Sequence, residues 1–166
     1  LRVYGAALSP TSAWQILQGV ETLPLRMERH CSNALAVARF LRGHRQVRWV
    51  NYPGLEDHPQ HGLVTRQMRS VGSAPGASGL LSFGLAGGLV AGSRFIDAAQ
   101  FMSHVANIGD TRTLIIHPAS TTHRQLDETQ QLAAGVKPDM VRMSVGLEHI
   151  DDILWDIDQA LAAAAS

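Results

Sequence analysis

Apolar residues recur every three or four positions in three stretches of the chain, which is the spacing of helices with one buried face. The first helix is predicted over residues 10–21, because Ser9 and Pro10 are a favourable N-cap and first helical position. A second helix is predicted from Pro24 to Gly43, and a last one from about Ile150. The apolar positions that define the three helices are Trp14, Leu17 and Val20; Met27, Cys31, Leu35, Ala38 and Leu41; and Ile150, Ile153, Leu154, Ile157 and Leu161.

Four shorter runs of apolar or β-branched residues predict strands over residues 47–52, 79–85, 113–117 and 140–145. Between them we expect a short helix within residues 57–70, a mobile loop from Gly72 to Gly79, and a helix capped by Ser93 that continues through Val105. Several connections are too short for parallel crossovers. The pattern therefore predicts an α+β fold in which helices cover a mostly antiparallel, four-stranded sheet.

Composition narrows the classes of partner. The chain has 166 residues, the size of one ordinary domain, and its 14 basic residues balance its 14 acidic ones, so neither nucleic acid nor an anionic membrane is expected as a partner. No apolar run approaches the ~20 residues of a membrane span, and no basic-then-apolar leader opens the chain. The single cysteine, Cys31, is expected in the core and suits a reducing compartment, so we expect a cytoplasmic protein.

Two other residue patterns, histidine pairs and a glycine-rich stretch, suggest a metal site and a phosphate-binding loop, but their spacing supports neither. The closest histidine pairs, His58 with His61 and His117 with His123, lack the spacing of known zinc motifs, so no metal site is predicted. The glycine-rich residues 72–92 lack both the GxGxxG spacing and the lysine-threonine ending of a phosphate loop. We interpret these glycines as loop and strand-end positions.

Arg142 is the most informative charged residue. The two-residue period of a strand places Met140, Arg142 and Ser144 on one face, and Val141, Met143 and Val145 on the other. An arginine midway along a short strand needs a carboxylate or phosphate partner, and its planar fork suits a carboxylate. The residue pattern leaves two partners open, an acid within the chain or a bound ligand.

Residues 106–110 and 118–123 are dense in small hydrogen-bonding side chains, in loops of the kind that often carry binding groups. The stretches NIGDTRTLIIHPASTTH (107–123) and VRMSVGLEHIDDILWDIDQAL (141–161) resemble the C-terminal signature of the trans-sulfuration enzymes, which depend on pyridoxal phosphate (PLP). Residues 5–41, 50–63 and 79–85 resemble further segments of that family in the same order, so nearly the whole chain is covered. Within that family, the sequence of residues 106–126 and 130–153 is most similar to that of the O-acetylhomoserine sulfhydrylases.

The resemblance implies a fold and a set of roles. The fold is the small C-terminal domain of PLP fold type I, with residues 23–166 as that domain and residues 1–22 as a linker and first helix joining it to a large domain that is absent. Arg142 matches the arginine that binds the substrate α-carboxylate, and Asn107 matches a residue that helps to hold it. Thr122 and His123 match a loop that lines the cleft. In the intact enzyme, a homo-oligomer that is a tetramer in the family, the substrate would be O-acetylhomoserine and the product homocysteine or methionine.

The family's PLP-binding motifs are not found in this sequence. Lys137 is the only lysine, and it lies in a Gly-Val-Lys-Pro segment that matches a surface loop of the family. The chain alone is therefore predicted to bind no PLP and to be inactive, with no catalytic residue of its own. Two alternatives stay open: a piece of another trans-sulfuration enzyme, such as a cystathionine γ-synthase or a methionine γ-lyase, and a non-catalytic binding or interaction module of the same fold.

Overall fold

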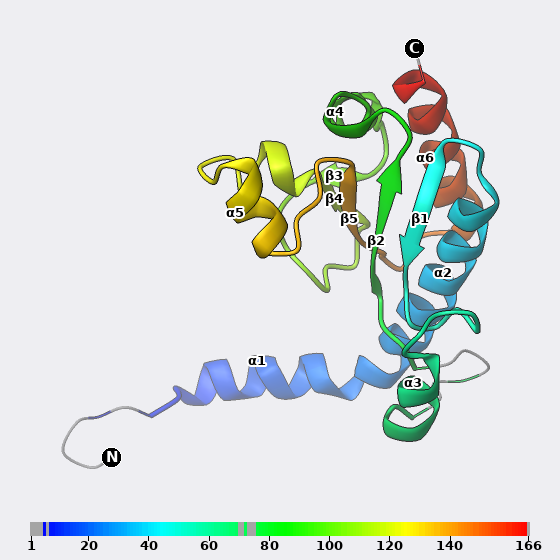
Figure 1. The fold of residues 1–166 in the computed structure, drawn as a ribbon. Coiled ribbons are helices and arrows are strands. Elements are labelled where there is room, and N and C mark those ends of the chain that lie inside the picture. The colour runs from blue at the N-terminus through cyan, green and yellow to red at the C-terminus, as the bar shows by residue number, and fades with distance from the viewer. Residues whose placement is uncertain (1–4, 6, 70–71, 73–75, 166) are drawn as a thin grey trace.

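The computed structural model describes residues 5, 7–69, 72 and 76–165. Its helices and strands alternate along most of the chain (Figure 1). In order they are α1 (Pro10–Glu21), α2 (Leu23–Gly43), β1 (Val47–Asn51), α3 (His61–Gln67), β2 (Leu80–Leu85), α4 (Gly88–Ala98), β3 (Ser103–His104), β4 (Leu114–Ile116), the 3-10 helix η1 (Pro118–Ser120), α5 (Glu128–Ala133), β5 (Met140–Ser144) and α6 (Ile150–Ala164).

The α+β class is confirmed, and three of the four strand pairs are antiparallel, but the predicted number of four strands is wrong. The sheet is mixed and has five strands in the order β1-β2-β5-β4-β3. The β1–β2, β2–β5 and β5–β4 pairs are antiparallel, whereas β3 pairs with β4 in parallel. Because β3 is only two residues long, it has no periodicity that a sequence pattern could reveal.

The helix predicted from Ser93 through Val105 is also misplaced. It begins earlier, at Gly88, and ends at Ala98, so Met102 precedes the short strand β3 and Val105 follows it. The sequence pattern also missed η1 and α5, which is opened by a capping box between Asp127 and Gln130. The mobile loop expected at 72–79 includes residues 73–75, which lie outside the described part of the chain.

The core lies on one face of the sheet. Phe83 of β2, Val141 and Met143 of β5, and Ile115 of β4 are fully buried there against α2, α4 and α6. Figure 1 shows α2 and α6 side by side along the sheet, with α5 on its other side. Cys31 is buried as expected, and burial raises the pKa of its thiol, which disfavours the reactive thiolate. The opposite face of the sheet carries the polar residues of β2 and β5.

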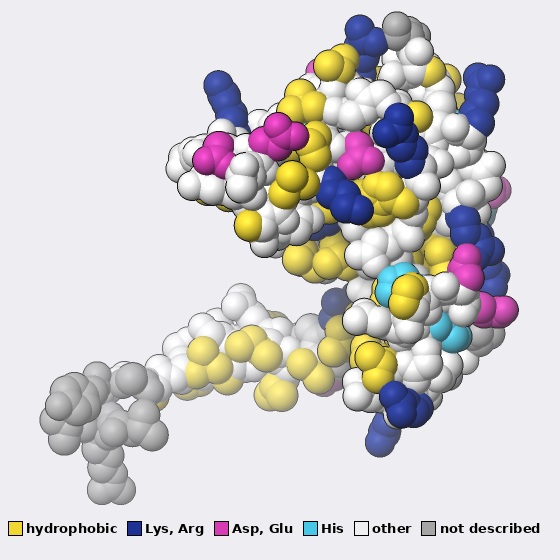
Figure 2. All heavy atoms as spheres, in the orientation of Figure 1, with side chains coloured by type: hydrophobic (Ala, Val, Ile, Leu, Met, Phe, Trp, Pro, Cys, Tyr) yellow, Lys and Arg dark blue, Asp and Glu magenta, His cyan; other side chains and the backbone are white. Residues whose placement is uncertain are grey.

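Helix α1 projects away from this body (Figure 1). Its cap forms as expected, with the Ser9 hydroxyl accepting a hydrogen bond from the Ser12 amide at 3.1 Å. None of the residues of α1 is buried, and Trp14 and Leu17 are 60% and 61% exposed. Figure 2 shows a row of apolar side chains along it. None of the described helices is both long and apolar enough to cross a bilayer.

We expect the chain to self-associate through this exposed row. A 12-residue helix is marginally stable in water unless its apolar face is covered, so two copies gain by covering each other. Light scattering should show a mass that rises with protein concentration. Changing Trp14 and Leu17 to lysine should suppress the rise, whereas the same change at the exposed polar residues Gln15 and Gln18 should not. A chain that stays monomeric at high concentration would contradict the expectation.

Candidate functional site

Arg142 lies at the middle of the polar face of the sheet. It is opposite Ser82 of β2 and Ile116 of β4, and residues directly opposite in antiparallel strands point to the same side. Ile116 is buried, whereas Arg142 is only partly buried. The two-residue alternation predicted from the sequence is therefore confirmed, since Val141 and Met143 are in the core. Arg142 therefore has a polar neighbour on β2 and an apolar neighbour on β4.

The guanidinium has no acidic partner within the described residues. The salt bridges of that part of the chain involve Arg42, His44, Arg112 and His149, and none includes Arg142. Its hydrogen bond to protein is a long one of 3.4 Å, from Nη2 to the backbone carbonyl of Asn107. Of the two partners that the sequence left open, an internal acid is therefore not supported. Most of the donors of this fork remain available to an anion.

The structure brings Asn107 next to Arg142 through its backbone. The side-chain Oδ1 of Asn107 accepts a hydrogen bond from the Ile108 amide at 2.9 Å, so it organises its own loop. Farther along, the Asp110 carboxylate accepts a hydrogen bond from the Arg112 amide at 3.0 Å. That bond, together with the Arg112 side chain, lowers the pKa of Asp110 below its usual value. The loop is thus held in shape by two of its own side chains.

Ser144 is a residue whose role the sequence did not reveal. It is two residues beyond Arg142 on the same face and is 3% exposed. Its hydroxyl accepts a hydrogen bond from the Gly109 amide at 3.0 Å, and Gly109 has a positive φ of 81° that favours glycine. Ser144 therefore ties the loop of Asn107 to the strand of Arg142. The two-residue period was the signal that could have assigned it to the site.

Thr122 and His123 lie farther along the chain, between η1 and α5. The hydroxyl of Thr122 and Nδ1 of His123 are 2.9 Å apart, and the His123 carbonyl accepts a hydrogen bond from the side-chain amide of Gln131 at 2.9 Å. Among the described residues, no hydrogen bond joins either of them to Arg142 or Asn107. The structure therefore assembles Arg142 and Asn107 directly, whereas Thr122 and His123 stay a prediction.

Two hollows meet at Leu80 of β2, and Arg142 lines one of them. One, of about 230 Å³, is lined by Arg142 together with Asn51, Pro53, Leu80, Leu81, Ser82 and Met140. The other has the same volume and lies toward α2, with Ser144, Gly109 and Leu80 in its wall. Leu80 belongs to both. The described residues contain no group of three histidine, cysteine or acidic side chains that could hold a metal ion. What the arrangement offers is a guanidinium with free donors at the wall of a small hollow, which suits a compact carboxylate ligand.

Comparison with known proteins gives one consistent family. Residues 1–162 match the model of the Cys/Met metabolism PLP-dependent enzymes. The chain is 53% identical, over 162 residues, to O-acetyl-L-homoserine sulfhydrylase 1 of Thermus thermophilus, and 45% identical, over 161 residues, to the L-methionine gamma-lyase of Pseudomonas putida. A crystal structure of an O-acetylhomoserine (thiol)-lyase from Campylobacter jejuni, which contains a pyridoxyl-lysine phosphate, superposes with a TM-score of 0.83 at 42% identity.

These matches cover nearly all of the chain but only a part of each relative. The alignment takes in 98% of this chain and 37% of the Thermus protein, and 97% of this chain and 39% of the Pseudomonas protein. The Campylobacter structure is covered to 37%. The chain thus spans well under half the length of the proteins that it resembles.

Proposed function

Because the chain belongs to the Cys/Met metabolism PLP-dependent enzymes, we propose that it is the substrate-carboxylate-binding region of an O-acetylhomoserine sulfhydrylase. The whole enzyme would replace the acetoxy group of O-acetylhomoserine with sulfide or a thiol, giving homocysteine or methionine. The observation that carries the proposal is the Arg142 guanidinium, which has no acidic partner in the described residues and lies beside the loop of Asn107.

The described residues do not fit a covalent site for PLP. Lys137 is exposed, and its Nζ lies 4.6 Å from the ring centroid of Trp49 in a cation–π contact. PLP reacts with amino acids through an aldehyde that a lysine holds, whereas the Lys137 ammonium lies over the Trp49 ring at an open surface hollow. We therefore propose that the cofactor lysine belongs to the part of the relatives that this chain does not cover, and that the chain by itself is inactive.

The chain's own residues bind and orient the substrate. The Arg142 fork would take both carboxylate oxygens, and the half-buried setting would strengthen the pair relative to water. The carbonyl of Asn107 fixes one edge of the guanidinium, and Ser144 fixes the loop that carries Asn107. Thr122 and His123 are proposed to line the same cleft. Helix α1, with its row of exposed apolar side chains, is proposed to join the domain of residues 23–166 to the PLP-binding region.

The experiment that tests the proposal measures amino-acid binding to the chain itself. Titration of O-acetyl-L-homoserine into isotope-labelled chain should shift the Arg142 and Ile108 NMR signals with a millimolar dissociation constant. Arg142→Met should weaken binding at least about tenfold, because a charge-assisted bidentate pair is lost. Arg142→Lys should give an intermediate loss, since a point charge cannot replace the fork.

Arg66 provides the matched control. It is an exposed arginine of α3, and Arg66→Met removes the same charge without touching the polar face of the sheet. Equal binding by the Arg142→Met and Arg66→Met chains would refute the proposal that Arg142 binds the substrate carboxylate.

The 45% identity to a methionine gamma-lyase supports one alternative, a lyase of the same family. Carboxylate binding by Arg142 would serve either enzyme. Which reaction occurs must therefore be decided by measuring the activity of the longer protein.

A further inference from the structure

The hollow that Arg142 lines contains hydrogen-bond donors and no acid. Its polar lining residues are Asn51, Ser82 and Arg142, and the others are apolar. The three polar residues lie in register on one face of the sheet, with Asn51 of β1 opposite Ser82 of β2, and Ser82 opposite Arg142 of β5. Because neighbouring strands are about 4.8 Å apart, Ser82 lies midway between two residues whose backbones are about 10 Å apart. An anion above Ser82 would therefore meet donors on both sides.

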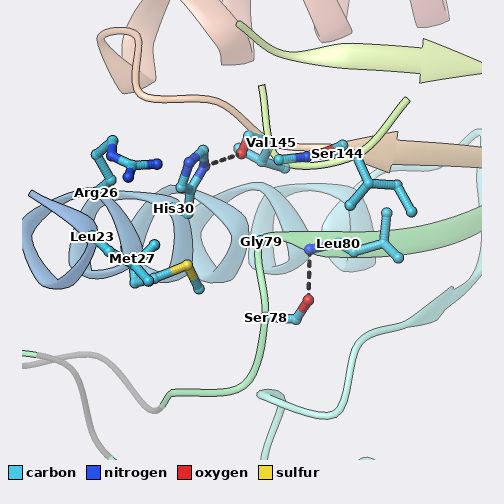
Figure 3. Close-up of a pocket in the computed structure, with 11 residues that line it drawn as sticks. Leu23, Arg26, Met27, His30, Ser78, Gly79, Leu80, Ser144 and Val145 are labelled. Carbon is cyan, nitrogen blue, oxygen red and sulfur yellow. Dashed lines mark hydrogen bonds between the residues drawn. The ribbon is translucent and has the colours of Figure 1, made fainter. Parts of the chain in front are cut away.

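The neighbouring hollow, which shares Leu80 with this one, also has an arginine in its wall. Figure 3 shows that residue, Arg26, on the α2 side of the hollow. Its Nε donates a hydrogen bond to the Thr22 hydroxyl at 3.3 Å, and its Nη2 donates one to the Gly19 carbonyl. Arg142, by contrast, makes one long hydrogen bond within the described part of the chain. The hollow of Arg142 is therefore the better supplied with free donors.

His58 fixes which atom of the Asn51 side chain is free. The backbone amide of Gln60 donates a hydrogen bond to Nδ1 of His58 at 3.1 Å, so Nδ1 has the lone pair and Nε2 of the neutral ring carries the proton. Nε2 lies 2.8 Å from Oδ1 of Asn51 and therefore donates to it. The Nδ2 amide group of Asn51 makes no hydrogen bond among the described residues, and it remains as a donor at the hollow.

A bound carboxylate needs more donors than one guanidinium gives. Its two oxygens offer about four acceptor positions, and a bidentate arginine fills two of them. We propose that Ser82 and Asn51 donate to the remaining positions, and that His58 is a positioning residue that acts through Asn51. The inference rests on the proposed function, because it requires a carboxylate on Arg142. It adds two ligand-binding residues from β1 and β2, outside the loop of Asn107.

The direct test follows the side-chain amide signals of Asn51 by NMR while O-acetyl-L-homoserine is titrated into the labelled chain. These signals should shift and saturate with the same dissociation constant as the Arg142 signals. The side-chain amide of Gln67 is the control, since Gln67 is exposed at the end of α3 and is not in the lining. Asn51 signals that stay as unchanged as those of Gln67 would overturn the inference.

Substitutions test the same contact by affinity. Asn51→Leu should weaken binding about fivefold, the effect of losing one exposed hydrogen bond to a charged group, and Ser82→Ala should weaken it about threefold. Asn51→Asp should cost at least about tenfold, because it places a like charge beside the ligand. The matched changes Gln67→Leu and Gln67→Asp should leave the affinity unchanged.

A double substitution tests the role of His58. His58→Phe should weaken binding about threefold in the wild-type chain and have no further effect in the Asn51→Leu chain. An equal loss in both chains would show that His58 does not act through Asn51. If Arg142→Met weakens binding but Asn51→Leu and Asn51→Asp do not, the inference fails and the proposed function stands. If Arg142→Met also binds like the wild type, the proposed function fails as well.

Discussion

Replacement of Asp156 by alanine should lower the free energy of unfolding by about 3 kcal/mol, although Asp156 is far from the candidate site. Asp156 is a completely buried carboxylate on α6. Its two oxygens accept hydrogen bonds from the amides of Gln100, Phe101 and Met102, at 2.9, 2.9 and 2.8 Å. Alanine would leave these three donors without an acceptor, and that of Met102 is buried.

Urea unfolding of the two chains, followed by circular dichroism, measures the difference as a lower midpoint at constant slope. Asp158→Ala is the matched control on the same helix. Its carboxylate is exposed, and its ion-pair partner, Nε2 of His44, is 3.6 Å away, so a change within about 0.5 kcal/mol is expected. If Asp156→Ala costs no more than Asp158→Ala, the three amides must be satisfied in another way.

The same carboxylate explains why the sequence misplaced a helix. Ile96, Ala99, Met102 and Val105 continue a helical spacing, and periodicity alone gives no reason to stop within it. The helix ends at Ala98 because the carboxylate of Asp156, more than 50 residues away in the sequence, accepts hydrogen bonds from the backbone amides of Gln100 and Phe101. These amides would otherwise continue the helix. A long-range hydrogen bond of this kind leaves no trace in a local sequence pattern.

Elements whose boundaries depend on local chemistry were predictable. Ser9 and Pro10 start α1, and α2 ends at the predicted Gly43. At the site, the two-residue period placed Arg142 on the polar face, because alternation within a strand is also local. The contact of Arg142 with the Asn107 carbonyl joins residues that are 35 positions apart, and the hollow that Arg142 lines is formed by separate segments of the chain. Only the folded arrangement of the sheet could reveal these features.

Gly92→Ala should destabilise the protein by about 2 kcal/mol, although alanine is the better helix former by about 1 kcal/mol. Gly92 is a buried residue of α4, and a Cβ there would overlap Cδ2 and Nε2 of His117. The ring of His117 is 1% exposed and cannot move aside freely. Its Nε2 donates a hydrogen bond to the Pro138 carbonyl at 2.8 Å, and its Nδ1 accepts one from the Ser120 hydroxyl at 2.8 Å. Either the overlap remains or these bonds are lost.

Gly62→Ala is the control, because Gly62 is also helical and has no atom within 4 Å of the added Cβ. It should stabilise the chain by roughly 0.5–1 kcal/mol, so the two substitutions should shift the urea midpoint in opposite directions. The His117 ring also anchors the start of the segment that carries Thr122 and His123, so Gly92→Ala should shift the NMR signals of residues 117–126 and Gly62→Ala should not. If Gly92→Ala stabilises the chain as Gly62→Ala does, the ring is free to move, and this segment is not held in place by α4.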